Sequence, residues 1–179
     1  MLVRTAQLAD LNACYEMDKS YLTDYVWQMH SQGSARAVEV RFDLIRLPRP
    51  MKVEYPRHPD ELFENWSREE CFLVAVDETD TVLGFLDMTV QAWHNTAWIR
   101  NLAVHKEHRR QGIGSMLLRS ARVWASERGL GGVMAEAQTK NYPAIRFWQK
   151  HGFVYCGYND RYYTNGDIAV FFFLRIGHP

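Results

Sequence analysis

The chain has 179 residues, of which 47% are hydrophobic and 23% charged, a balance typical of a globular protein and not of a disordered one. Lys plus Arg and Asp plus Glu are equal at 21 each, so no overall field favours a nucleic acid or an anionic membrane. Any anion site must therefore be local. The sequence shows no internal repeat and no Gly/Ser linker, and we expect one domain over residues 1–179.

The cysteines and the apolar runs indicate in which cellular compartment the protein is expected. Cys14, Cys71 and Cys156 are odd in number and lack the C-x2-C spacing of zinc sites, so we expect neither a disulfide scaffold nor a metal. The first residues do not resemble a signal peptide, and the longest apolar run, residues 168–174, is too short to span a bilayer. These features predict a soluble protein of the reducing cytoplasm.

The first third of the chain combines short elements with an unusual insertion. Residues 2–6 are predicted as a strand, and Asp10 as the cap of the helix that follows. Within the insertion, at about residues 24–59, alternating apolar and charged residues predict a strand over 38–44, and residues 25–29 could form its partner. Because prolines cannot donate to a ladder, we expect this strand to end before the prolines of residues 47–50.

From residue 60 onward, predicted strands and helices alternate. A short helix is expected over 60–66, and an amphipathic helix from about Gly112 to a stop at Gly129. A further short helix is expected over residues 143–150. The predicted strands cover residues 71–76, 82–90, 96–104, 132–138, 153–158 and 167–174. This order predicts an α/β layer architecture with a hairpin-like finish.

Residues 104–115 carry the main chemical signal of the sequence. A strand ends, a basic loop with Arg109 and Arg110 follows, and Gly112 and Gly114 open a helix. The first N–H groups of a helix have no internal partner, and the helix dipole places partial positive charge there. Glycines let a phosphate approach the backbone, so the pattern predicts a pyrophosphate cradle. Taken alone, a tight helix entry with a solvated basic turn explains the pattern equally well.

Other nucleotide or nucleic-acid sites fit less well. A Rossmann fingerprint would need a glycine where Leu117 stands and would follow the first strand of the sheet. A P-loop would need Lys and Ser or Thr after the glycines, and they are absent from the sequence there. The basic residues of 36–52 alternate with acidic and apolar ones, which is typical of the solvated face of a strand and not of a nucleic-acid site.

Residues 109–114 (RRQGIG) resemble motif A of the GNAT superfamily of N-acetyltransferases, whose core is Arg/Gln-x-x-Gly-x-Gly/Ala. Downstream, residues 136–141 (EAQTKN) and 144–153 resemble the strand–Asn–helix–Gly-Phe signature of the same family at the expected distance. Within the superfamily, residues 136–138, 157–163 and 167–169 are similar to streptothricin-type acetyltransferases. That group usually carries acidic residues where this chain has Arg-Asn at positions 100–101.

This resemblance implies a GNAT-like fold: an α/β (α+β) mixed, strongly twisted sheet of six to seven strands, flanked by helices. The sheet would be splayed where acetyl-CoA, the cosubstrate, enters. Pantetheine would pair with the backbone near Leu102 and Val104, the pyrophosphate would lie on amides 109–115, and Asn141 would contact the coenzyme from the other side. The implied coenzyme-binding residues are Leu102, Ala103, Val104, Arg109, Arg110, Gln111, Gly112, Ile113, Gly114, Ser115 and Asn141.

The implied reaction is acetyl transfer to a primary amine by direct attack on the thioester. A lysine amine of pKa ~10.4 is only ~0.1% neutral at physiological pH, so a base is useful. Glu136 is the expected base, since it flanks the cleft and shares a strand face with Gln138. Trp148 stands where the family has a tyrosine acid, and an indole cannot supply a proton. We therefore expect it to pack, and the tyrosines that could replace it are Tyr142, Tyr158, Tyr162 and Tyr163.

The alternative to an enzyme is a module that binds acetyl-CoA without turnover, which the absent tyrosine would permit. Glu136 argues against this alternative, because a pure sensor has no need of a base there. The acceptor amine could belong to a small molecule or to a protein N-terminus or lysine. A homodimer is an open alternative for the assembly.

Overall fold

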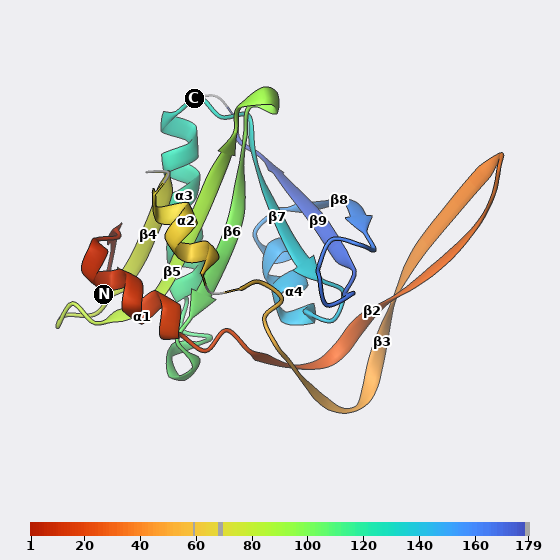
Figure 1. Cartoon of the computed structure of the whole chain (residues 1–179), viewed down its shortest axis with the longest axis horizontal. Helices are drawn as coiled ribbons and strands as arrows, with labels where there is room; N and C mark the ends of the chain where they lie inside the picture. Colours follow the sequence, from red (N-terminus) through yellow and green to blue (C-terminus); the bar gives the residue numbers. More distant parts are fainter. Residues whose placement is uncertain (59, 68–69, 178–179) are drawn as a thin grey trace.

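A computed structural model describes residues 1–58, 60–67 and 70–177. Within these residues, seven strands form a mixed sheet with helices on both faces, and a long two-stranded hairpin projects from one end (Figure 1). Pro59, the last residue of the expected insertion, lies outside the described residues. No helix in the described part of the chain is long and apolar enough to cross a membrane.

The seven strands lie in the order β1-β4-β5-β6-β7-β9-β8. Neighbours are antiparallel except for β6 and β7, which are parallel. The bounds are β1 (Leu2–Thr5), β4 (Cys71–Val76), β5 (Val82–Gln91), β6 (Thr96–Val104), β7 (Gly132–Gln138), β8 (Val154–Asn159) and β9 (Ala169–Arg175). The sequence predicted β4, β6 and β7 with these bounds and the other strands to within one or two residues.

The helices divide between the two faces of the sheet. They are α1 (Leu11–Glu16), α2 (Glu61–Ser67), α3 (Ile113–Glu127) and α4 (Tyr142–Lys150), with short 3-10 turns at Leu8–Asp10, Ala92–His94 and Lys106–His108. Apolar residues of α1 and α2 pack with Phe72, Val74 and Phe85. Those of α3 and α4 pack on the other face, with Leu86 and Phe172. The predicted helices are confirmed, and α4 begins one residue earlier than expected.

The two parallel strands part soon after they meet. β6 and β7 pair only at three positions, Thr96 with Gly132, Ala97 with Val133 and Trp98 with Met134. Beyond these pairs the strands diverge, as the lower half of Figure 1 shows. The splayed, GNAT-like sheet that the resemblance implied is therefore confirmed.

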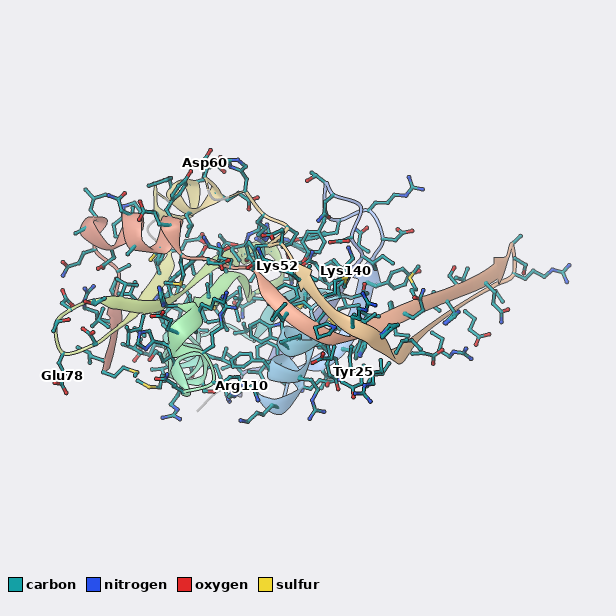
Figure 2. The ribbon with its side chains drawn as sticks, turned by 90° about the horizontal axis from the view of Figure 1, so that it is seen from below. Tyr25, Lys52, Asp60, Glu78, Arg110 and Lys140 are labelled. Atoms are coloured by element: carbon teal, nitrogen blue, oxygen red, sulfur yellow. The ribbon has the colours of Figure 1, made fainter. Side chains whose placement is uncertain are left out.

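The inserted segment forms the hairpin of β2 (Tyr21–Ser34) and β3 (Ala37–Val53). The prediction that the second strand ends before the prolines of 47–50 is wrong. The register jumps from Thr23–Met51 to Tyr25–Arg46, so residues 47–50 lie in a bulge where no ladder donor is needed. Figure 2 shows Tyr25 near the base of the projecting arm.

The base of the hairpin is anchored to the sheet at its splayed end. The Trp27 main-chain N–H donates to the Thr139 carbonyl at 2.9 Å, and the Trp27 ring lies 6.1 Å from the ring of Phe172. The Tyr21 hydroxyl donates to Gln138 Oε1 at 2.8 Å. The insertion thus reaches the end of β7, where the two parallel strands are apart.

Asp10 precedes α1 but does not cap it, so the predicted role of its side chain is wrong. The carboxylate accepts from the Gln7 amide at 2.6 Å and from the Arg4 guanidinium at 2.7 and 3.1 Å. These bonds close the turn ahead of α1, and neither oxygen accepts from the helix amides. The hydrogen bond from Arg4 holds the pKa of Asp10 below its usual range.

Replacing Asp10 with Asn should lower the free energy of unfolding by about 1–3 kcal/mol at neutral pH, because charge-assisted hydrogen bonds are lost. The folded-state pKa of Asp10 is depressed, so its stabilisation is present above the unfolded pKa of ~4 and is lost as the pH falls through the folded value. Urea denaturation at pH 7 and at low pH should therefore show the difference between variant and wild type shrinking in acid. Asp80→Asn, at the exposed end of the same Arg4 network, should change stability far less. A difference for Asp10→Asn that does not vary with pH would contradict this account.

Candidate active site

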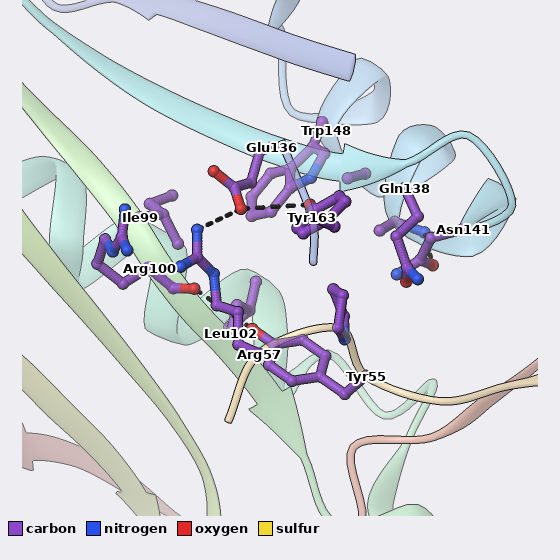
Figure 3. Close-up of a pocket in the computed structure, with 13 residues that line it drawn as sticks. Tyr55, Arg57, Ile99, Arg100, Leu102, Glu136, Gln138, Asn141, Trp148 and Tyr163 are labelled. Atoms are coloured by element: carbon purple, nitrogen blue, oxygen red, sulfur yellow. Dashed lines mark hydrogen bonds and ion pairs between the residues drawn. The ribbon is translucent and has the colours of Figure 1, made fainter. Parts of the chain in front are cut away.

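A cavity of about 60 Å³ lies where β6 and β7 part (Figure 3). Its walls come from β6, β7, α4 with the residue before it, the segment 54–58 that follows β3, and the loop between β8 and β9. The lining residues are Tyr55, Pro56, Arg57, Ile99, Arg100, Leu102, Glu136, Ala137, Gln138, Asn141, Ala144, Trp148 and Tyr163. The structure thus brings together Leu102, Glu136, Asn141 and Trp148, which the sequence placed at the cleft.

The side chain of Glu136 is only 6% exposed and is surrounded by donors in the cavity wall. Its Oε1 accepts from the Arg57 guanidinium and from the Tyr163 hydroxyl at 3.2 Å. Its Oε2 accepts from the Tyr162 hydroxyl at 2.5 Å and from Trp98 Nε1 at 3.0 Å. Burial raises the pKa of both tyrosines, so their hydroxyls remain protonated donors at neutral pH. A substrate group can reach the carboxylate only where one of these donors withdraws.

Gln138 also lines the cavity, as period-2 spacing from Glu136 predicted, but its amide is held at both ends. Its Oε1 accepts from Tyr21 and its Nε2 donates to Asp167 Oδ2 at 2.5 Å. Among the tyrosines left open as a replacement acid, Tyr163 alone lines the cavity. Tyr142 instead packs on Tyr25, with ring centroids 5.3 Å apart.

Arg57 and Tyr55 are cavity residues that sequence reasoning missed. One guanidinium nitrogen of Arg57 contacts Glu136 and the Tyr162 hydroxyl at 3.1 Å, and the other donates to Glu61 Oε2 at 3.0 Å. The Tyr55 hydroxyl bonds to β6 at Asn101 Oδ1, at 2.8 Å. The segment carries no apolar periodicity, so only its charged and aromatic residues could have drawn attention to it.

The loop before α3 and the first turn of that helix present a row of free main-chain donors. From Arg110 to Ser115, six consecutive N–H groups have no acceptor within the described residues, and the first helical bond runs from Met116 to the Gly112 carbonyl at 3.0 Å. Arg110 and Gly112 have positive φ angles of 66° and 88°, which make this stretch of backbone concave. Gly114 lies where α3 meets α4, since a Cβ there would be in van der Waals contact with the Phe147 ring at 3.4 Å. Figure 2 places Arg110 at the start of α3.

Arg109, expected at the coenzyme, is engaged by the protein itself. Its guanidinium donates to the carbonyls of Val104, Ser20 and Asp18 at 3.0, 2.7 and 2.6 Å, and so ties the loop to the segment before β2. Its main-chain N–H points to the Lys106 carbonyl at 3.5 Å. The side chain of Arg110 is exposed, and within the described residues it has no ion-pair partner.

The main chain of β6 offers further free groups to the gap. The His105 N–H donates to Leu83 of β5 at 2.8 Å, so the alternate residues Val104 and Leu102 face away from β5. The Val104 carbonyl is taken by Arg109, which leaves the Leu102 amide and carbonyl facing the opening. The main chain of Ala103 faces β5. Its peptide groups are therefore directed away from the opening in which the coenzyme was expected.

Two residues of α4 complete the wall. Asn141 caps the helix, since its Oδ1 accepts from the Ala144 N–H at 3.1 Å. Trp148 is buried and packs on Phe147 and Phe153, with ring centroids 5.0 and 5.2 Å away, as the packing prediction required. Its indole N–H, however, is a buried donor with no acceptor among the described residues. Such a donor costs about 1–3 kcal/mol unless a ligand or water satisfies it.

Comparisons with known proteins identify the family to which this splayed sheet belongs. Residues 41–153 match the acetyltransferase (GNAT) family, and the chain belongs to that family of N-acetyltransferases. It is 30% identical over 177 residues to streptothricin acetyltransferase of Streptomyces lavendulae, which covers 94% of this chain and 91% of the relative.

Two solved structures extend this similarity to three dimensions. The fold is similar to that of nourseothricin acetyltransferase, with a TM-score of 0.81 and 23% identity over 98% of each chain. It is also similar to a Bacillus anthracis (strain Ames) protein assigned as a streptothricin acetyltransferase and solved in complex with acetyl coenzyme A. That comparison has a TM-score of 0.77 and 26% identity, over 97% of this chain and 98% of the other.

Proposed function

We propose that the protein transfers an acetyl group from acetyl-CoA to a primary amine of a small, streptothricin-like acceptor. The observation that supports this function best is the row of six free N–H groups ahead of α3, beside the opening between β6 and β7. The Bacillus anthracis relative binds acetyl coenzyme A, and the Streptomyces lavendulae relative is named for streptothricin. Both are similar to this chain over nearly its full length.

The groups that line the opening fit a coenzyme of this kind. The amides from Arg110 to Ser115 suit a pyrophosphate, because they combine unpaired donors with the positive end of the α3 dipole. The exposed Arg110 side chain can add a full charge. The free amide and carbonyl of Leu102 suit the two amide groups of a pantetheine arm. Bound acetyl-CoA supplies a thioester whose carbonyl carbon an amine can attack.

Glu136 is the residue that we propose as the base for the acceptor amine. It lies in the cavity with both oxygens on donors, and the loss of one donor would let the carboxylate face an incoming ammonium group. Such a contact would place the proton acceptor within hydrogen-bond reach of the group to be deprotonated. A module without turnover is the second candidate, because all four donors together also suit a purely structural carboxylate.

Gly112→Val should weaken acetyl-CoA binding at least tenfold in calorimetry, because a branched side chain would fill the space in front of the free amides. A Cβ at Gly112 meets no atom within 4 Å, so the effect would not come from a clash inside the protein. Gly129→Val is the matched control: Gly129 has a φ of 66°, and a Cβ there is equally unobstructed, but it lies beyond the other end of α3. Both variants share the backbone strain of a positive φ. Equal affinity losses in the two variants would contradict the cradle.

Glu136→Gln separates the two candidate functions. If Glu136 is the base, acetyl-CoA should still bind while acetylation of streptothricin falls about 10²–10⁴-fold, the usual size of a general-base contribution. Thiol release measured with and without acceptor provides the rate, and calorimetry provides the affinity. Turnover close to that of the wild type would remove Glu136 from the mechanism. Binding without thiol release in the wild type, over a panel of amines, would favour the module.

Trp148→Tyr should retain at least a tenth of the wild-type turnover. A coenzyme A thiol with a pKa of ~8.5 leaves adequately as a thiolate, so the reaction needs no strong acid at position 148. The phenol, like the unpaired indole N–H, carries one donor that a ligand or water can satisfy. Turnover and acetyl-CoA affinity should be measured together. Loss of turnover with intact binding and folding would show that the indole has a specific role.

A further inference from the structure

The surroundings of Glu136 have the composition of a cation site. Three aromatic side chains donate to the carboxylate: Trp98, Tyr162 and Tyr163. Phe171 completes the group, since its ring lies 5.7 Å from that of Trp98 and 5.2 Å from that of Tyr162, in edge contacts. A carboxylate within a cluster of aromatic rings attracts an ammonium or guanidinium group through its charge and through cation–π contact.

This site is filled by a cation of the protein itself. The Arg57 side chain is only 9% exposed, and its guanidinium forms the ion pair with Glu136. The guanidinium carbon also lies 5.8 Å from the centre of the Tyr162 ring. Figure 3 shows Arg57 reaching across the cavity toward Glu136 from the segment after β3. In this state both carboxylate oxygens of Glu136 are engaged by donors of the protein.

We propose that Arg57 occupies the position of the acceptor's ammonium group, and that the acceptor binds by displacing the guanidinium from Glu136. Glu136 with Trp98, Tyr162 and Tyr163 is then the cation subsite for the acceptor. Arg57 sets its specificity, because an amine binds there only if it competes with the internal guanidinium. This inference rests on the proposed function for its biological meaning, but the cation subsite itself can be tested without acetyl transfer.

The structure offers Arg57 a second partner when it leaves Glu136. Its other terminal nitrogen already donates to Glu61 Oε2 at 3.0 Å, and Glu61 is the first residue of α2, four positions along the chain. Arg57 itself lies outside any helix or strand, so its displacement breaks no ladder. The Tyr55 anchor on β6 can keep the segment in place while the side chain swings.

The test removes the Arg57 cation by substitution and asks whether a small cation in solution can take its place. Arg57→Met keeps a long apolar stem but removes the cation, and leaves Glu136 beside three neutral donors. Propylammonium and methylguanidinium chloride should each raise the melting temperature of this variant by about 3–5 °C at ten times their dissociation constants. Wild type, with Arg57 in the subsite, should shift by less than a third as much. Sodium chloride at equal ionic strength provides the baseline.

Two variants separate the subsite from general salt effects. Arg57→Met with Glu136→Gln removes both charges of the pair, so neither probe should raise its melting temperature. Arg41→Met breaks an exposed ion pair with Asp43 on the hairpin and should also show no response. The proposal is overturned if propylammonium fails to stabilise Arg57→Met, or if it stabilises the double variant equally. A response to methylguanidinium alone would also overturn it, because the subsite would then fit arginine and not an amine.

The result is independent of the proposed function. If acetyl-CoA fails to bind the wild type, the enzymatic proposal fails while the cation subsite can still be found in Arg57→Met. If acetyl-CoA binds and amines are acetylated but neither probe rescues Arg57→Met, the subsite proposal fails alone.

Discussion

β6 and β7 are held together at one end and released at the other. At the closed end, the Gly131 N–H donates to the Asn95 carbonyl at 2.9 Å, and the Asn95 side chain donates to the Gly129 carbonyl at 3.1 Å. Gly132 lets β7 pass beneath Phe173, since a Cβ there would come within 2.3 Å of the ring. β7 then pairs with β9 along its whole length, and this pairing carries it away from β6. The cavity, the free edge of β6 and the access to Glu136 all follow from that divergence.

The first N–H groups of any helix lack an internal partner, and in this chain the row of free donors extends back from α3 to Arg110. Here the Leu102 peptide groups and the amides from Arg110 to Ser115 stand ready at two sides of one opening. They are fixed by elements that pack well away from the opening: β6 on β5, and α3 on the sheet through residues such as Ile113 and Leu117. A ligand that pairs these groups pays little ordering entropy, and binding to the folded state alone stabilises it.

Local patterns in the sequence were sufficient for much of the fold. Apolar strand segments placed β4, β6 and β7, and period-3.6 spacing placed α3, because their apolar side chains are buried in the core; β4 is buried at every residue. The glycines of residues 112–114 likewise marked the free amides. The prolines of 47–50 misled, because a register shift in the partner strand accommodates them and no local pattern predicts where a bulge falls. Asp10 misled for a similar reason, since its partner Arg4 lies on the strand before it.

The site residues that the sequence did not predict all depend on contacts between distant segments. Arg109 looked free because the carbonyls of Asp18 and Ser20 reach it only in the folded chain. Tyr55 and Arg57 lie in an irregular segment after β3, and their contacts with β6 and Glu136 form only when the insertion returns across the sheet. Motif reasoning finds groups that act through their own backbone. It does not find side chains whose role is defined by the residue opposite.

Charge balance explains how the cleft could serve the proposed cationic acceptor although Arg100 of β6 lines the cavity. The Arg100 guanidinium lies 3.7 Å from Glu61, so a carboxylate of α2 offsets its charge. Arg57 offsets Glu136 in the same way, which makes burial of that carboxylate tolerable before any ligand arrives. When the Arg57 guanidinium turns to Glu61, Glu136 is left as the uncompensated charge of the cavity. The negative charge that a cationic amine requires is then supplied by β7, at the strand that faces the acceptor across the splayed gap.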